Sequence, residues 1–331
     1  MQFGQLRRRE FLGVLGSAAA AWPLTADAQQ QSTRVVGFLS SRAPGESAGL
    51  IAAFRKGLRQ MGFVEGQNLV IAFRWAEGHY DRLAILAADL VDLHVEVLFA
   101  AGGSPSAVAA KAATSTIPVV FLAGDPVHLG LVASLNKPGG NVTGISNLSA
   151  ELAAKSVELL QEMAPGAKVI AYLVNSSNPI AESVSTEAQA AGSTLGIEIH
   201  GLNARTSGEL DEAFETMAKL HISALGVMPD PFLDTQRERL LKLCARHKVA
   251  GCYPWREYVT AGGLMSYGSN LVESYRQAGI YAGRILKGER PADLPVMQPV
   301  RYELLINLQT AKVLGLQVPP KLLALADEVI E

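Results

Sequence analysis

The sequence has only two cysteines among its 331 residues, Cys244 and Cys252. An even number of cysteines allows one disulfide in an oxidising compartment. Cys244, however, falls in the apolar stripe of a predicted helix with Leu240 and Leu243, and Cys252 falls in the strand predicted next. These positions favour two buried free thiols, while a disulfide between them stays open as the alternative.

An excess of charge of either sign is also lacking. Lys and Arg number 29 and Asp and Glu number 31, which gives a net charge of −2. Nucleic-acid recognition usually needs a basic patch, so this balance argues against a nucleic-acid partner. Beyond residue 28 the chain has no uninterrupted apolar run long enough to span a bilayer, and nothing in it indicates binding to a membrane surface.

The compact motifs of catalysis and nucleotide binding are missing as well. The chain contains no G-x-S-x-G, H-E-x-x-H, P-loop or G-x-G-x-x-G sequence. Its histidines lie far apart, with no two at i, i+4, so neither a metal site nor a cofactor is predicted. An exported α/β enzyme that uses Asp125, His128 or Asp230 is kept as a weak alternative, because no nucleophile–base pair is visible.

What the chain does have begins with a leader. Three arginines at residues 7–9 precede an apolar run, residues 11–24, that is too short to span a bilayer comfortably. An A-x-A cleavage site follows at residues 26–28. The R-R-x-F-L sequence at residues 8–12 fits the twin-arginine form of bacterial export signal. We therefore expect residues 1–28 to be a cleaved export signal and the remaining chain to reside in the periplasm.

Residues 95–127 carry the clearest local pattern. A short apolar strand leads into a Gly-rich loop at residues 102–104, which can cap the helix predicted over 107–113. A second apolar strand, residues 119–123, ends in the Gly-Asp-Pro sequence of 124–126. Two successive strands thus end in small polar loops at one edge of a parallel sheet. In open α/β sheets that edge is where ligands bind.

The same unit recurs along the chain. Strands alternate with helices at βα spacing, which predicts mainly parallel sheets with helices on both faces. After the helix that begins at Ser149 the pattern restarts, and strand 169–175 resembles the first strand, 34–41. The intervals 35–62 and 169–196, each from a strand to a helix-ending glycine, are equal in length. We interpret this as a second lobe of the same design.

Polar and aromatic residues gather at the predicted strand ends, where a ligand would lie. The helix that opens at Ser104 would suit a carboxylate. Asp125 or Asp230 could pair with an ammonium group, and Trp255 or Tyr267 could cover an apolar face. Each residue alone is equally typical of a turn or a cap, so the prediction depends on their shared edge. The predicted ligand-binding residues are Ser40, Ser41, Gly102, Gly103, Ser104, Asp125, Pro126, Ser146, Asn147, Asn175, Asn178, Asp230, Trp255 and Tyr267. The predicted ligand is an amino acid or a related small carboxylate.

Four blocks resemble a known family. They are AAGGSPSAVAAKAATSTIPVVFLAGDPV (100–127), LNKPGGNVTGISNLSAELAAK (135–155), GGLMSYGSNLVESYRQAGIYAGRILKGERPADLPV (262–296) and INLQTAKVLGLQVP (306–319). On these residues the chain resembles the ABC-transporter substrate-binding family that includes tryptophan-binding proteins. The similarity spans essentially the whole chain beyond the leader.

The resemblance implies the architecture of type I periplasmic binding proteins. That is an α/β fold of two Rossmann-like lobes with parallel sheets, three crossovers and a ligand cleft between the lobes. The implied first lobe is 33–147 plus 262–290, the second is 150–258 plus 293–331, and the hinge strands lie near 146–150, 258–263 and 290–296.

The resemblance also implies a function. The protein would capture a small solute by lobe closure and deliver it to an ABC permease in the inner membrane, without chemistry on the solute and as a monomer. An alternative with the same fold is a periplasmic sensing partner of a signalling receptor, which the sequence does not separate from a transport role.

Overall fold

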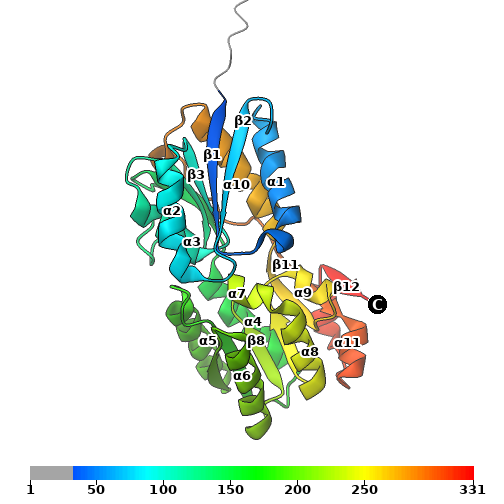
Figure 1. The fold of residues 1–331 in the computed structure, drawn as a ribbon. Helices are drawn as coiled ribbons and strands as arrows, with labels where there is room; N and C mark the ends of the chain where they lie inside the picture. The colour runs from blue at the N-terminus through cyan, green and yellow to red at the C-terminus, as the bar shows by residue number, and fades with distance from the viewer. Residues whose placement is uncertain (1–32) are drawn as a thin grey trace, which may run out of the picture. The chain divides into compact units, whose positions relative to one another are not determined.

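The structure, a computed structural model, describes residues 33–331; the predicted export signal, residues 1–28, lies outside this part of the chain. Within it the strands form two sheets, and helices pack against each of them (Figure 1). No helix in the described part is both long and apolar enough to cross a membrane.

The first lobe is built on a five-stranded, wholly parallel sheet with the order β2-β1-β3-β4-β5. Helices α1, α2, α3 and α10 pack against this sheet. The strands are β1 (Arg34–Ser40), β2 (Leu69–Trp75), β3 (Val97–Ala101), β4 (Val119–Ala123) and β5 (Val142–Ser146), and the helices are α1 (Ala48–Gln60), α2 (Leu83–Asp92), α3 (Ser104–Ala113) and α10 (Leu271–Leu286), with short 3-10 turns η1 (Pro44–Glu46), η2 (Tyr80–Arg82) and η3 (Pro291–Asp293).

Both faces of this sheet are buried, which explains why its strands are nearly continuous apolar runs. Along β3, Val97 and Phe99 belong to the core under α1 and α10, whereas Leu98 and Ala100 belong to the core under α2 and α3. Phe99 stacks on Phe54 of α1, with ring centroids 4.5 Å apart. Successive side chains of a strand point to opposite faces of the sheet, so β3 contributes residues to both cores.

Glycines set the distance between α1 and α10, which lie side by side in Figure 1. A Cβ added at Gly57 would lie 2.0 Å from the carbonyl oxygen of Arg276, and one at Gly279 would lie 2.2 Å from the carbonyl oxygen of Phe54. The two backbones approach closely because neither position carries a side chain. This contact joins a segment near residue 280 to the first lobe.

The second lobe has a seven-stranded sheet with the order β12-β11-β10-β9-β8-β6-β7. All its neighbouring strands are parallel except β10 and β11, which are antiparallel. Its strands are β6 (Val169–Val174), β7 (Glu198–Asn203), β8 (Ala224–Val227), β9 (Ala250–Tyr253), β10 (Met265–Ser269), β11 (Tyr302–Asn307) and β12 (Glu328–Ile330), and its helices are α4 (Ser149–Met163), α5 (Ala181–Leu195), α6 (Ser207–Lys219), α7 (Pro231–Thr235), α8 (Arg237–His247), α9 (Arg256–Thr260), α11 (Leu308–Val313) and α12 (Pro320–Leu325).

The chain passes between the two sheets three times, and two of the passages differ from the sequence prediction. The first, between β5 and α4, lies within the predicted 146–150. The second comes at Asn270, because β10 pairs with β9 in the second sheet; the prediction that residues 262–269 belong to the first lobe is therefore wrong. The third follows Met297, which still bridges Ile145 of β5, so residues 293–297 pack with the first lobe.

Leu148, at the first passage, has an unusual backbone. Its φ is +49° and its ψ is +50°, the left-handed region that L-residues with a bulky side chain rarely occupy. The residue lies at the N-terminal end of α4, directly after the buried Asn147. The chain therefore turns sharply where it leaves the first sheet for the second.

Candidate functional site

The loops after β1 and β3 lie against each other at the carboxyl edge of the first sheet. The Ser41 hydroxyl donates to the carbonyl oxygen of Gly102, and the Gly102 N–H donates to the Tyr275 hydroxyl at 3.1 Å. Gly102 has a φ of +82°, and a Cβ there would lie 2.7 Å from Ser41 Oγ. The predicted Gly-rich loop is thus required both by its backbone conformation and by the close approach of Ser41.

Ser104, predicted as a helix cap, instead ties two strand ends together. Its hydroxyl accepts the N–H of Gly124 at 3.1 Å and is buried at the first residue of α3. A Cβ at Gly124 would lie 2.4 Å from Ser149 Oγ, on the first turn of α4. The loops after β3 and β4 and the start of α4 therefore meet at one point.

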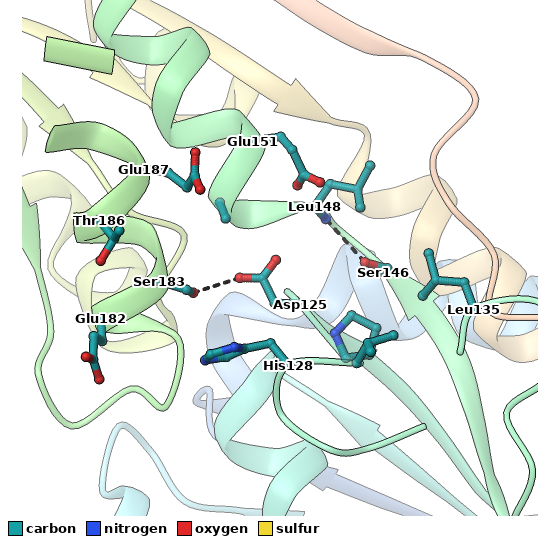
Figure 2. A pocket seen from close by; sticks show the side chains of 13 residues that line it. Asp125, His128, Leu135, Ser146, Leu148, Glu151, Glu182, Ser183, Thr186 and Glu187 are labelled. Carbon is teal, nitrogen blue, oxygen red and sulfur yellow. Dashed lines mark hydrogen bonds between the residues drawn. The ribbon is translucent and has the colours of Figure 1, made fainter. Parts of the chain in front are cut away.

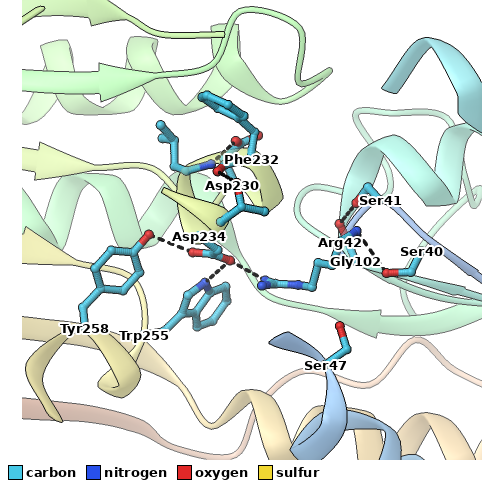
Figure 3. A network of polar contacts seen from close by, with 12 residues as sticks. Ser40, Ser41, Arg42, Ser47, Gly102, Asp230, Phe232, Asp234, Trp255 and Tyr258 are labelled. Carbon is cyan, nitrogen blue, oxygen red and sulfur yellow. Dashed lines mark hydrogen bonds and ion pairs between the residues drawn. The ribbon is translucent and has the colours of Figure 1, made fainter. Parts of the chain in front are cut away.

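A buried ion pair joins the lobes at this edge. Arg42, two residues after the end of β1, pairs through Nη2 with Asp234 of α7. This carboxylate also accepts from Trp255 Nε1 at 3.1 Å and from the Tyr258 hydroxyl at 2.9 Å (Figure 3). Burial opposes the charge of Arg42, but the Asp234 carboxylate outweighs it and raises the pKa of the guanidinium. Burial also raises the pKa of the Tyr258 hydroxyl, which stays a donor.

Asp230, at the end of β8, is buried among neutral donors. Its carboxylate accepts from Asn178 Nδ2 at 2.9 Å, from Asn175 Nδ2 at 3.2 Å and from the Leu233 N–H at 2.9 Å. Tyr80, from the first lobe, donates its hydroxyl at 2.7 Å. Burial raises the pKa of Asp230 although these hydrogen bonds oppose it. Among the described residues, all of these hydrogen-bond donors to the Asp230 carboxylate are neutral.

Arg42, Asp230 and Trp255 from these two networks line a small cavity between the lobes. Its volume is about 20 Å³, close to the space that one water molecule needs. Two buried polar atoms of its lining have no hydrogen-bond partner in the described part of the chain: Nε of Arg42 and Oδ1 of Asn147. The residues that line the cavity are Arg42, Gly102, Gly103, Ser104, Leu122, Gly124, Asn147, Ser149, Asn178, Ile180, Pro229, Asp230, Pro231, Trp255, Leu271 and Tyr275.

Gly102, Gly103, Ser104, Asn147, Asn178, Asp230 and Trp255 were predicted for the site and do line this cavity. Ser40, Ser41 and Asn175 do not line it but support it: Ser40 Oγ accepts the Arg42 N–H, and Asn175 holds Asp230. The sequence prediction missed Arg42, Tyr80, Asp234 and Tyr275. Arg42 could have been found, since it directly follows Ser40 and Ser41 at a strand end.

Asp125, Pro126 and Ser146 line a different, wider hollow of about 460 Å³, which also lies between the lobes (Figure 2). There Asp125 accepts from the Ser183 hydroxyl of α5 at 2.8 Å. Glu151, Glu182 and Glu187 also line this hollow, and within residues 33–331 no lysine or arginine lines it. These three predicted residues therefore belong to a second, acidic hollow.

Tyr267 is brought to neither hollow, which corrects its predicted place in the site. It lies on β10, opposite Leu304 of β11, and its ring stacks on Tyr302 with centroids 5.9 Å apart. Neighbouring strand residues point to opposite faces of the sheet, so a strand-end position alone did not fix where the ring points.

Both cysteines are buried free thiols, as favoured from the sequence. Burial raises the pKa of each to about 12. The Tyr253 hydroxyl lies 3.2 Å from Cys244 Sγ. Among residues 33–331 no group of three or more His, Cys, Asp or Glu side chains could hold a metal ion.

Two α/β lobes joined by three crossings, with polar strand-end loops of both lobes around one cavity, define a type I periplasmic binding fold. Residues 45–330 match the family described as ABC transporter substrate binding protein. The chain is 30% identical to the tyrosine-binding protein of Clostridioides difficile (strain R20291) over 266 residues, which cover 80% of this chain and 76% of the relative. The protein therefore belongs to the ABC transporter substrate-binding protein family.

Two solved structures extend the comparison, each at 26% identity and each covering 90% of this chain. The ABC domain from Streptococcus pneumonia in complex with L-Trp matches with a TM-score of 0.83 over 100% of its chain. The ligand-free, open structure of a substrate binding protein with adhesive properties from Clostridium difficile matches with a TM-score of 0.63 over 99% of its chain. At equal identity, the fold superposes better on the complex than on the open structure.

Proposed function

We propose that this protein is the solute-binding component of an ABC importer, and that it captures an amino acid or related small carboxylate by closing its lobes. The observation that carries the proposal is that polar strand-end loops of both lobes face each other. They are joined by Arg42–Asp234 and Tyr80–Asp230, and they also line the wider hollow of about 460 Å³. A solute held there contacts both lobes, so its binding favours the closed arrangement.

The relatives support this proposal. The named relative is a tyrosine-binding protein, and the better structural match is a complex with L-Trp rather than an open structure. The three crossings supply a hinge of the kind that such closure requires. In this proposal the lobes carry out no chemistry on the solute; closure removes it from water and presents it to a permease.

Ligand-induced stabilisation tests the capture step. A ligand that binds only the folded chain raises the free energy of unfolding by about 2.7 kcal/mol at a hundredfold excess over Kd. A thermal-shift screen with the twenty amino acids, short hydroxy acids, sugars and purines should give a shift with an amino acid or small carboxylate. Shifts with sugars or purines alone would contradict the ligand class, and no shift with any compound would contradict capture in the cleft.

The location and the partner belong to the same proposal. We expect export through the twin-arginine sequence, and a monomer that docks on the permease of its importer. Arg8→Lys combined with Arg9→Lys should hold the precursor in the cytoplasm, as measured by fractionation. Recovery of that double variant from the periplasm at the normal level would exclude the twin-arginine route.

A further inference from the structure

The wider hollow between the lobes has room for an amino acid, whereas the cavity of about 20 Å³ beside Arg42 does not. Its volume is about 460 Å³, within the range of roughly 300–1,000 Å³ that is typical of ligand pockets. The first lobe contributes the loop after β4, and the second contributes α5 and the start of α4 (Figure 2). Under the proposed function, the chemistry of this lining selects the solute.

Carboxylates determine the charge of this lining. Asp125, Glu151, Glu182 and Glu187 line the hollow, and none of the four forms an ion pair with a lysine, arginine or histidine between residues 33 and 331. Asp125 is half-buried and accepts from the Ser183 hydroxyl at 2.8 Å, a neutral donor. The hollow therefore carries an uncompensated negative charge, which attracts a cation and repels an anion.

The hollow also has an apolar wall. Pro126, Val127, Leu135, Leu148 and Ala150 line it beside the carboxylates. Val127 is 46% exposed, so its side chain is available to an apolar group of a solute, and covering it would remove apolar surface from water. Methylene groups suit this wall, and a cationic end suits the carboxylates. The side chains of lysine and arginine have both parts.

The exposure of the lining indicates how such a solute would lie. His128, Glu182, Thr186 and Glu187 are exposed, so the hollow is open to water on their side, whereas Asp125 is half-buried. A solute carboxylate on the open side keeps its hydration, but beside Asp125 it would face a like charge with less water around it. The cationic end of the solute therefore belongs at Asp125 and the α-carboxylate on the open side.

We propose that this hollow selects an amino acid with a cationic side chain, whose ammonium or guanidinium group binds the Asp125 carboxylate and whose methylene groups pack on Val127 and Leu148. This inference rests on the proposed function and narrows its ligand class from amino acids in general to basic ones. It makes Asp125 a specificity-determining residue of this chain, with the surrounding glutamates adding to the same field.

Titration calorimetry on the full chain beyond its leader tests the proposal. L-arginine is compared with its neutral isostere L-citrulline, and L-lysine with L-norleucine; L-tryptophan and L-tyrosine complete the set of amino acids. Agmatine and cadaverine serve as the matching amines without a carboxylate. We expect L-arginine or L-lysine to bind at least tenfold more tightly than its neutral isostere and than both aromatic amino acids, because a hydrogen bond between charged groups is stronger than one to a neutral group.

Variants assign the selection to the carboxylates. Asp125 has a φ of +46°, a left-handed conformation that Asn also adopts, so Asp125→Asn removes the charge and keeps the backbone. It should weaken binding of the basic amino acid at least tenfold and leave binding of the neutral isostere unchanged. Glu182→Gln combined with Glu187→Gln should weaken it at least threefold, a smaller loss because water screens these exposed charges. Glu215→Gln, on the exposed side of α6 and outside the hollow, should change neither affinity.

The outcomes separate this inference from the proposed function. Tightest binding of a neutral or aromatic amino acid, or unchanged preference for the basic amino acid in Asp125→Asn, would overturn the inference and leave amino-acid capture standing. If Asp125→Asn fails to fold, as judged by circular dichroism, the double glutamine variant decides in its place. Tightest binding of agmatine, cadaverine, a sugar or a purine would overturn both the inference and the ligand class. Failure of every compound in both screens would overturn the proposed function as well.

Discussion

Tyr80 of the first lobe donates its hydroxyl to the Asp230 carboxylate of the second lobe at 2.7 Å, and the same oxygen accepts the Phe232 N–H at 3.1 Å. One phenol thus bonds both the end of β8 and the first turn of α7 from across the cleft. This contact couples the buried Asp230 to lobe closure, because opening the lobes removes one of its donors.

Tyr80→Phe should therefore destabilise the closed arrangement of the lobes. The variant leaves an acceptor on a buried carboxylate and one backbone N–H without a partner, which should lower the free energy of unfolding by about 1–3 kcal/mol. Chemical denaturation measures this loss, and small-angle scattering should show a larger radius of gyration. A variant with unchanged stability and unchanged scattering would show that the hydroxyl does not hold the lobes together.

Asp234→Asn tests the buried ion pair. The change leaves the Arg42 guanidinium buried without its anion, and removal of one partner from such a pair costs about 3–5 kcal/mol. Asp211→Asn is the matched control, since Asp211 pairs with Arg239 on the surface and solvent screens that pair. Urea denaturation should give a clearly lower free energy of unfolding for Asp234→Asn than for Asp211→Asn. Equal stabilities would mean that the Arg42–Asp234 pair is not buried in solution.

Gly57→Ala tests the contact between α1 and α10. Its Cβ would meet the Arg276 carbonyl oxygen, so the helices must separate, and overpacking of this kind costs about 1–3 kcal/mol. Gly49→Ala in the same helix has no atom within 4 Å of its new Cβ and should leave stability unchanged or raise it by up to about 1 kcal/mol. Thermal unfolding compares the two. A harmless Gly57→Ala would contradict the close approach of the helices.

The cysteines allow a test of pH dependence. With a pKa of about 12 in the folded protein, against 9.0 for an ordinary thiol, Cys244 and Cys252 stay neutral where unfolded thiols ionise. Their contribution to stability is complete below pH 9 and declines as the pH rises from there towards 12. At pH 9 iodoacetamide should modify both thiols only after denaturation, as measured by mass spectrometry. Rapid labelling of the native chain would contradict their burial.

The local sequence pattern predicted much of the fold. The apolar run at residues 119–123 predicted β4 with its observed bounds, and the Gly-rich loop at residues 102–104 predicted the start of α3. The lobe boundary at residue 262 was wrong, because a glycine pair followed by a short strand has the same pattern whether the strand joins the first sheet or the second. The strand belongs to the second sheet because it pairs with β9, and this long-range contact cannot be predicted from the neighbouring residues.

The candidate site shows the same distinction between local and long-range determinants. The sequence by itself determined which segments become strands and which small polar residues end them, because strand period, glycine conformation and helix capping act over a few neighbouring residues. Only the tertiary structure decided that Arg42 meets Asp234, 192 residues away, that Asp125 faces the wider hollow, and that Tyr267 turns towards Tyr302. Those contacts follow from how two separately formed sheets pack and from which face each side chain occupies, and these are long-range properties of the whole chain.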